Sequence, residues 1–129
     1  MAIIASDLKV MKSVMVTDTP ANGGRMSAVE SLTNVKNNVF PDVSQAERES
    51  GVTRYRKLFF KVANDDDLTL FDGRIHMVNP SGAQDHFVLF AGSHTDSQAD
   101  LTGAEDQYGC GKLSTSVSAG ATSFDVTLE

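Results

Sequence analysis

The stretch Arg54-Tyr-Arg-Lys-Leu-Phe-Phe-Lys-Val-Ala-Asn64, followed by the acidic run Asp65–Asp67, decides the expected fold. Its side chains alternate in character, which is typical of a β-strand with two different faces. We expect one face to pack in the core and the other to point outward, and the acidic run to turn into a second apolar strand at 68–78. The inward face carries Leu58, Phe60 and Val62, and the outward face carries Lys57, Phe59 and Lys61.

Three further segments have the pattern of strands. Residues 8–17 alternate but are interrupted by Lys12, which favours an edge or half-solvated strand. Residues 87–90 are apolar on both faces, which is typical of a central strand, and residues 122–129 alternate to the last residue. Five strands separated by turns predict a mainly β chain, namely an antiparallel β-sandwich of the immunoglobulin-like kind with one or two short surface helices. A barrel of the same strands is the alternative.

The first 50 residues carry less periodic pattern than the rest. Ser44 and Glu47 have the spacing of a capping box, and Gly51 stands where a helix would end, so we predict a short helix at 44–50. Residues 25–39 are ambiguous between a short helix, a short strand and irregular structure. We therefore expect residues 1–50 to form an N-terminal strand and extended arm, and 51–129 to form the sandwich core. Because the last strand ends with the sequence, we also expect a fragment of a longer polypeptide.

Composition excludes several classes of protein. The chain has 129 residues, 40% of them hydrophobic, which is enough for about one domain with a core. Its net charge of −6 argues against a nucleic-acid partner, which would need clustered lysine and arginine. No segment approaches the roughly 20 apolar residues of a membrane span, and the N-terminus lacks the features of a signal peptide. One cysteine allows no intrachain disulfide, so we expect a soluble product of a cytoplasm.

Three sets of residues were weighed as sites of chemistry. Asp65–Asp67 offers oxygens to a hard cation, the three histidines invite a metal or acid–base cluster, and Cys110 lies between two glycines. None has a recognised ligand or catalytic spacing. We therefore predict a solvated turn, structural histidines and a sharp loop, with no catalytic residue, no cofactor and no metal. The histidines are His76, His86 and His94.

The central stretch also carries the single basic cluster of the sequence. Its four cations surround two aromatic residues, an arrangement compatible with stacking on single-stranded nucleic acid. Because the rest of the chain is acidic, a contact with a partner protein is favoured, and a large outward aromatic such as Phe59 needs a cover. The cations are Arg54, Arg56, Lys57 and Lys61. The predicted interface consists of Tyr55, Lys57, Phe59 and Lys61.

Several blocks, taken in order, resemble a known family. The chain is similar to virion structural proteins of tailed bacteriophages and prophages, of the Mu-like kind, over roughly residues 22–128. The blocks are Asn22–Met26, Asn37–Ser44, Glu47-Arg48, Gly51, Arg56–Phe59, Val88–Phe90 and Asp96–Ala99. The resemblance implies a non-enzymatic, tail-associated component that acts by subunit assembly, with other virion proteins or itself as partner. It also implies the host cytoplasm and then the virion as location. The family has no agreed catalytic motif, so no functional residues carry over.

A second hypothesis keeps the same β domain but gives it another job. Residues 93–112 form a long polar connection rich in Asp, Thr and Gln. Such a loop could bind a glycan or protein of the host surface. An enzyme is the third hypothesis, and it requires a histidine and an acid to converge in a pocket.

Overall fold

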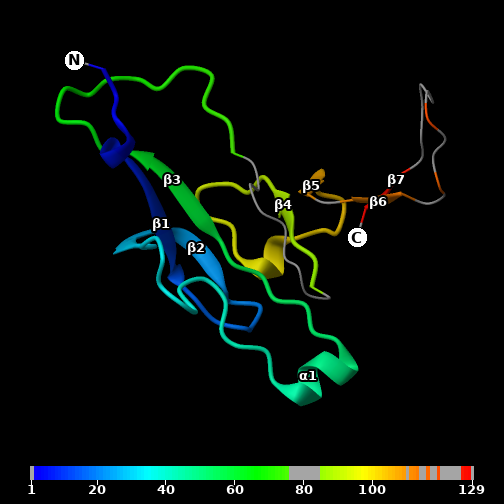
Figure 1. Ribbon diagram of the computed structural model, residues 1–129. Helices are drawn as coiled ribbons and strands as arrows, with labels where there is room; N and C mark the ends of the chain where they lie inside the picture. Colours follow the sequence, from blue (N-terminus) through cyan, green and yellow to red (C-terminus); the bar gives the residue numbers. More distant parts are fainter. Residues whose placement is uncertain are drawn as a thin grey trace. The chain divides into compact units, whose positions relative to one another are not determined.

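The computed structural model describes residues 2–75, 85–109, 111–113, 116, 119 and 126–128. Its contacts group into two compact units, residues 1–73 with 92–102, and residues 74–91 with 103–129. The described chain is mainly β, with antiparallel sheets, one α-helix and two short 3-10 turns (Figure 1). The elements are η1 (Ala5–Asp7), β1 (Leu8–Met15), β2 (Gly23–Glu30), α1 (Gln45–Ser50), β3 (Leu58–Val62), β4 (Val88–Phe90), η2 (Gln98–Asp100), β5 (Gln107–Gly109), β6 (Gly111–Leu113) and β7 (Val126–Leu128).

The first unit is built on a three-stranded antiparallel sheet with the order β2-β1-β3 (Figure 1). β1 and β3 pair regularly from Leu8 opposite Val62 to Lys12 opposite Leu58. β1 is therefore the central strand of the described sheet. Of the two alternatives predicted for 8–17, the edge strand was wrong and the half-solvated strand agrees with the exposure of Leu8 and Val14. The lysine that suggested an edge is accommodated because its ammonium group donates a hydrogen bond to the Asn38 carbonyl oxygen at 2.6 Å.

Strand pairing sorts the side chains of this sheet onto two faces, since directly paired residues point to the same side. We call one the apolar face: it carries Leu8, Val10, Lys12 and Val14 of β1 with Leu58, Phe60 and Val62 of β3. The mixed face carries Lys9, Met11 and Ser13 with Phe59 and Lys61.

The core of the described chain is thin and lies on the mixed face. Met11 is the one buried apolar side chain among the described residues, with 8% of its surface exposed, and Ser13 beside it is buried as well. Phe60 is 58% exposed, so its predicted place in the core was wrong. The reason is that no described strand of the first unit packs over the apolar face.

The expected hairpin after β3 was also wrong. The acidic turn is present, with the Asp67 amide donating to the Asn64 carbonyl oxygen at 3.3 Å. The partner of β3, however, is β1 from the start of the chain, and residues 68–75 form no strand. Residues 76–78 lie outside the described part. β1 pairs with β3 over five consecutive residues, from Leu8 to Lys12.

The predicted helix is confirmed. The Ser44 hydroxyl accepts a hydrogen bond from the Glu47 amide, and the Glu47 carboxylate accepts one from the Ser44 amide, which completes the capping box of α1. Gly51 follows with φ of 75°, a backbone angle that favours glycine. Of the ambiguous segment 25–39, the part to Glu30 belongs to β2 and the rest forms turns. Residues 8–30, expected in the N-terminal strand and arm, thus supply two of the three strands.

The second unit contains two short antiparallel pairs, β4 with β5 and β6 with β7. The strands predicted at 87–90 and 122–129 appear as β4 and β7, although 122–125 and 129 lie outside the described residues. β4 was expected to be central, but β5 is its one partner in the described sheet and Leu89 is exposed. The predicted turn at 79–82 lies outside the described residues. No helix in the described chain is long and apolar enough to cross a membrane.

Candidate functional site

A buried asparagine connects three segments of the chain near the start of β3. Asn22 is 2% exposed, and its side chain accepts a hydrogen bond from the Thr17 amide at 3.3 Å and donates one to the Tyr55 carbonyl oxygen at 2.9 Å. Its backbone amide donates to Thr19 at 2.9 Å, and its carbonyl accepts from Gln98 at 2.7 Å. One side chain and its own peptide groups therefore join the turn after β1, the residues before β3 and the start of η2.

The glycine after this asparagine allows a close backbone contact. Gly23 has φ of 112°, and a Cβ atom there would lie 3.0 Å from the Asp96 carbonyl oxygen. Next to it, the Gly24 amide donates to that same oxygen at 2.8 Å. Residues 96 and 97 consequently run against the start of β2, which a side chain at Gly23 would prevent.

Arg56 is the most connected cation of the basic cluster. Its guanidinium group pairs with Asp18 at 2.6 Å, donates to the Val39 carbonyl oxygen at 3.0 Å and lies 5.5 Å from the centre of the Phe40 ring. The hydrogen bond from Arg56 holds the pKa of Asp18 below its usual value. Since the Arg56 side chain is nearly buried, it acts inside the fold and offers no charge to a partner.

Arg54 and Lys57 are also committed to partners within the chain. Arg54 pairs with Asp18 at 3.4 Å and with Glu47 of α1. Lys57 pairs with Asp96, and its ammonium group lies 5.2 Å from the centre of the Phe59 ring. Burial raises the pKa of Asp96, but hydrogen bonds from Lys57 and Ser93 outweigh burial and lower it. Lys57 thereby fixes residues 93–97 against the mixed face.

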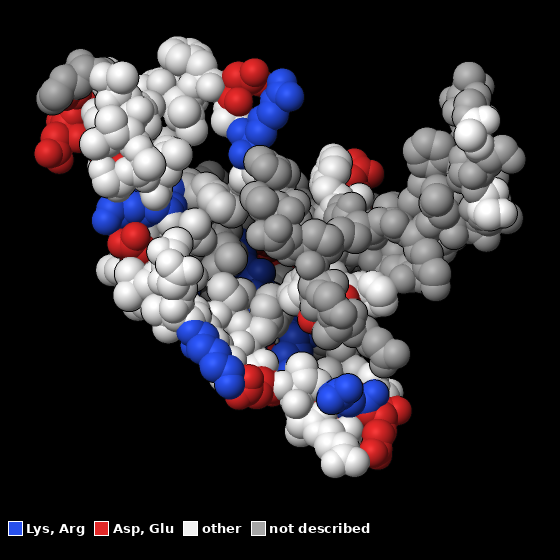
Figure 2. Space-filling model, viewed as in Figure 1, with Lys and Arg blue, Asp and Glu red and all other residues white. Residues whose placement is uncertain are grey.

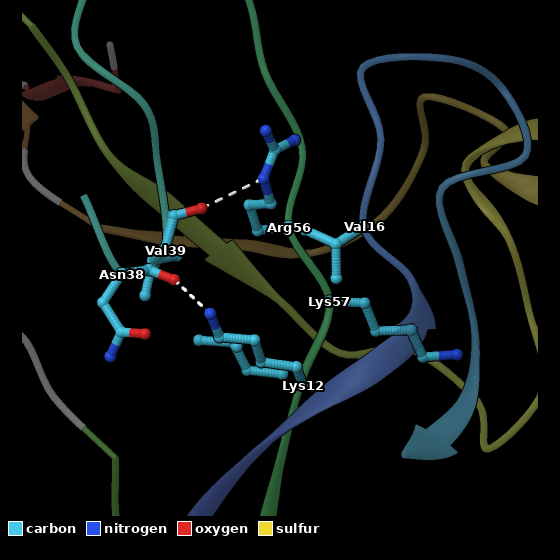
Figure 3. Close-up of a pocket in the computed structure, with 7 residues that line it drawn as sticks. Lys12, Val16, Asn38, Val39, Arg56 and Lys57 are labelled. Carbon is cyan, nitrogen blue, oxygen red and sulfur yellow. Dashed lines mark hydrogen bonds between the residues drawn. The ribbon is translucent and has the colours of Figure 1, made fainter. Parts of the chain in front are cut away.

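A small hollow lies where residues 38 and 39 meet the end of the apolar face (Figure 3). It has room for about one water molecule, with a volume of 10 Å³. Lys12 and Arg56 point toward the Asn38 and Val39 carbonyl oxygens, which they bind (Figure 3). The hollow is too small for a substrate, and its two hydrogen-bonded cations hold residues 38 and 39 on the sheet.

The four predicted interface residues differ in their placement. Tyr55 is half-buried, and its carbonyl oxygen accepts hydrogen bonds from Asn22 and Arg56. Lys57 and Phe59 are half-buried against each other. Lys61 is exposed and forms no ion pair with any residue that the structure describes. The interface stays a prediction, and Lys61 is the member of it that points freely to solvent.

Sequence reasoning missed the most exposed aromatic residue of β3. Phe60 lies on the apolar face together with the exposed side chains of Leu8 and Val14. Alternation places Phe59 and Phe60 on opposite faces but does not say which face is covered. Lys61, between Phe60 and Val62, is a charged residue of the kind that protects edge strands. Together with the regular pattern of β1, it was the sequence feature that indicated β3 as an edge strand.

Charge on the visible surface is mixed. Figure 2 shows acidic and basic side chains lying next to one another at several places.

The residues considered for metal binding do not assemble in the described chain. His86 and His94 are exposed, and Asp65–Asp67 is an exposed turn. Among the described residues there is no group of three or more His, Cys, Asp or Glu that could hold a metal ion. His76 and Cys110 lie outside the described residues.

Comparison with known proteins adds no relative. No family model matches the chain, and neither a curated protein nor a solved structure matches it. The chain is thus described by its class alone, a small mainly β protein with antiparallel sheets.

Proposed function

We propose that this chain is a non-enzymatic structural component of a bacteriophage or prophage virion, tail-associated, which acts by assembling with neighbouring subunits. The observation that carries the proposal is the apolar face of the three-stranded sheet, over which no described strand of the first unit packs. Leu8, Val14 and Phe60 present apolar surface to water there, and burial of such surface stabilises by about 25 cal/mol per Å². Docking of a subunit would remove that surface from water.

The resemblance to virion structural proteins supplies the setting for this proposal. On that basis we propose the host cytoplasm as its location during assembly and the virion afterwards. Within that setting we propose an immunoglobulin-like sandwich in which the sheet β2-β1-β3 is one layer. A neighbouring subunit docked over Leu8 and Phe60 would supply the second layer that a sandwich requires.

The contacts of residues 93–100 favour assembly over binding of a host-surface ligand. Asp96 is bound by Lys57 and by the Ser93 amide, and Asp100 accepts hydrogen bonds from the Ser97 amide and hydroxyl. These carboxylates already have partners within the chain, so they offer little to a glycan. Three of the four cations of the basic cluster, Arg54, Arg56 and Lys57, likewise bind acidic residues of their own chain, so they offer little to a phosphate backbone.

Incorporation into particles tests the proposal. Phe60→Glu and Leu8→Glu change exposed side chains of the apolar face, so the sheet should keep its circular dichroism while the variants fail to join particles. Gln45→Glu, on the exposed surface of α1, is the matched control and should be incorporated normally. Normal incorporation of both apolar-face variants would refute docking through this face.

A further inference from the structure

We propose that two copies of this chain join edge to edge through β3, antiparallel and centred on Phe60, so that two three-stranded sheets become one continuous sheet. This inference rests on the proposed function as an assembly component and names the partner as a second copy. It uses the free edge of β3, the sequence of that edge and the one cation there that has no ion pair within the described chain.

The direction of the backbone groups defines the free edge. The Ala63 amide donates to the Asp7 carbonyl oxygen at 2.7 Å, so Ala63 points its hydrogen-bonding groups toward β1. These groups alternate along an antiparallel strand, so Phe59 and Lys61 point theirs toward β1 too. Leu58, Phe60 and Val62 therefore point their amide and carbonyl groups away from β1.

The two edges of this sheet are not equivalent. β3 pairs with β1 without a bulge, whereas the pairing of β2 with β1 shifts register between the β1 residues Met11 and Ser13 and again between Ser13 and Met15. The start of β2 is also occupied, because the Gly24 amide donates to the Asp96 carbonyl oxygen. Bulges and cover protect an edge from pairing with another chain. In the described part of the sheet, β3 is thus the regular edge that is open to another strand.

Among the registers centred on the three middle residues of β3, the sequence favours one for pairing with itself. A pair centred on Phe59 places Lys57 opposite Lys61 of the second copy, and a pair centred on Lys61 places two copies of that lysine opposite each other. Like charges directly opposite each other are destabilising. Centring on Phe60 avoids both contacts, because Leu58 then faces Val62 of the second copy and Phe59 faces Lys61 of the second copy.

This register also satisfies the free groups of the edge. The outward residues form three hydrogen-bonded pairs, and two hydrogen bonds per pair give about six in all. The two Phe60 side chains then lie next to each other on a continuous apolar face. Each Lys61 lies over Phe59 of the second copy, which repeats between chains the contact that Lys57 makes with Phe59 at 5.2 Å within one chain.

A cysteine scan of β3 tests the register directly. In a Cys110→Ser background, single cysteines replace residues 58 to 62 in turn, and the full-length protein is oxidised and examined on a non-reducing gel. Paired residues lie about 5.5 Å apart between Cα atoms, which a disulfide can span. Phe60→Cys should therefore form a linked dimer. Leu58→Cys and Val62→Cys should stay unlinked, since each lies about 13 Å from its own copy.

Further variants keep the test decisive. Phe59→Cys and Lys61→Cys report the two rejected registers, and linkage of either as strongly as Phe60→Cys overturns the inference. The double variant Leu58→Cys/Val62→Cys should link even if Phe60→Cys does not fold. Sedimentation of the unmodified protein should give twice the chain mass of 13.8 kDa, and a monomer at every concentration overturns the inference.

Failure of the inference and failure of the proposed function are separable. If the protein is found in particles but Phe60→Cys does not link, the edge pairing is wrong and the structural role stands. If Phe60→Cys links but the protein is absent from particles, the virion role is wrong and the self-pairing stands.

Discussion

Replacing the buried Asn22 with alanine should destabilise the first unit more than the same change at a half-buried asparagine. Asn22→Ala deletes two side-chain hydrogen bonds, one from the Thr17 amide and one to the Tyr55 carbonyl oxygen. The Tyr55 oxygen keeps a hydrogen bond from Arg56, but the Thr17 amide loses the side-chain partner that binds it.

The magnitude follows from burial. Each net hydrogen bond contributes about 1 kcal/mol, and a buried donor left unsatisfied costs about 1–3 kcal/mol more. Because Asn22 is 2% exposed, water cannot replace its side chain freely. We expect Asn22→Ala to lower the free energy of unfolding by about 3 kcal/mol, a large part of the roughly 5–15 kcal/mol available to a small protein.

Asn64 offers a matched control. Its side chain also forms two hydrogen bonds, donating to the Asp7 carboxylate at 2.9 Å and accepting from the Asp66 amide at 2.9 Å, but it is only half-buried. Water can take over both contacts, so Asn64→Ala should cost about 1 kcal/mol.

The measurement is urea unfolding followed by tyrosine fluorescence. The chain has two tyrosines and no tryptophan, so a Tyr108→Phe background leaves Tyr55 to report on the first unit. The reasoning is refuted if Asn22→Ala costs no more than Asn64→Ala.

Three further predictions use the same unit. Lys57→Met removes the ion pair with Asp96 and should speed hydrogen exchange at the Gly24 amide, which is bound to the Asp96 carbonyl oxygen. The control Lys61→Met should leave that exchange rate unchanged. Equal effects of the two variants would contradict the role of the Lys57 ion pair. Gly51→Ala should lower the free energy of unfolding by about 1–3 kcal/mol because the residue has a positive φ. Gly23→Ala should have a larger effect, because its Cβ would also meet backbone atoms. The opposite order of the two variants in urea midpoints would refute this prediction. The pKa values of Asp18 and Asp96 are lowered in the folded state, so the stability that these two carboxylates contribute is present above about pH 4 and is lost as the pH falls through their folded pKa values. Urea midpoints should therefore decrease when the pH is lowered below about 4, and the double variant Asp18→Asn/Asp96→Asn should show a smaller decrease. Midpoints that stay constant below about pH 4 would contradict this prediction.

Local sequence patterns predicted local structure well. The capping box at Ser44 and Glu47, with Gly51 after it, gave α1 because every contact lies within a few residues. The centre of the stretch 54–64 gave β3 for the same reason, since alternation is a property of the strand itself.

Pairing and burial could not be predicted in the same way. Whether β3 joins residues 8–12 or 68–78 depends on a competition between distant segments, and Lys12 misled because its hydrogen-bond partner lies 26 residues further along. Phe60 was assigned to the core because alternation identifies two faces without showing which is covered.

The position of the basic cluster could be predicted from the sequence, but its ion pairs could not. The basic residues around β3 were recognised, yet their acidic partners Asp18, Glu47 and Asp96 come from three separate parts of the sequence. In the sequence Asn22 stands out only as the first residue of a block in the family resemblance, because burial of one asparagine has no signature in a single sequence.

The virion role is tested most directly by quantifying this protein in purified phage particles. Particles from an induced host are purified through a density gradient, and the protein is measured by mass spectrometry against known virion proteins. A structural component should stay with the particles at a fixed ratio to tail proteins through successive gradients. Absence of the chain from purified particles, with its presence in the host lysate, would contradict the proposed function.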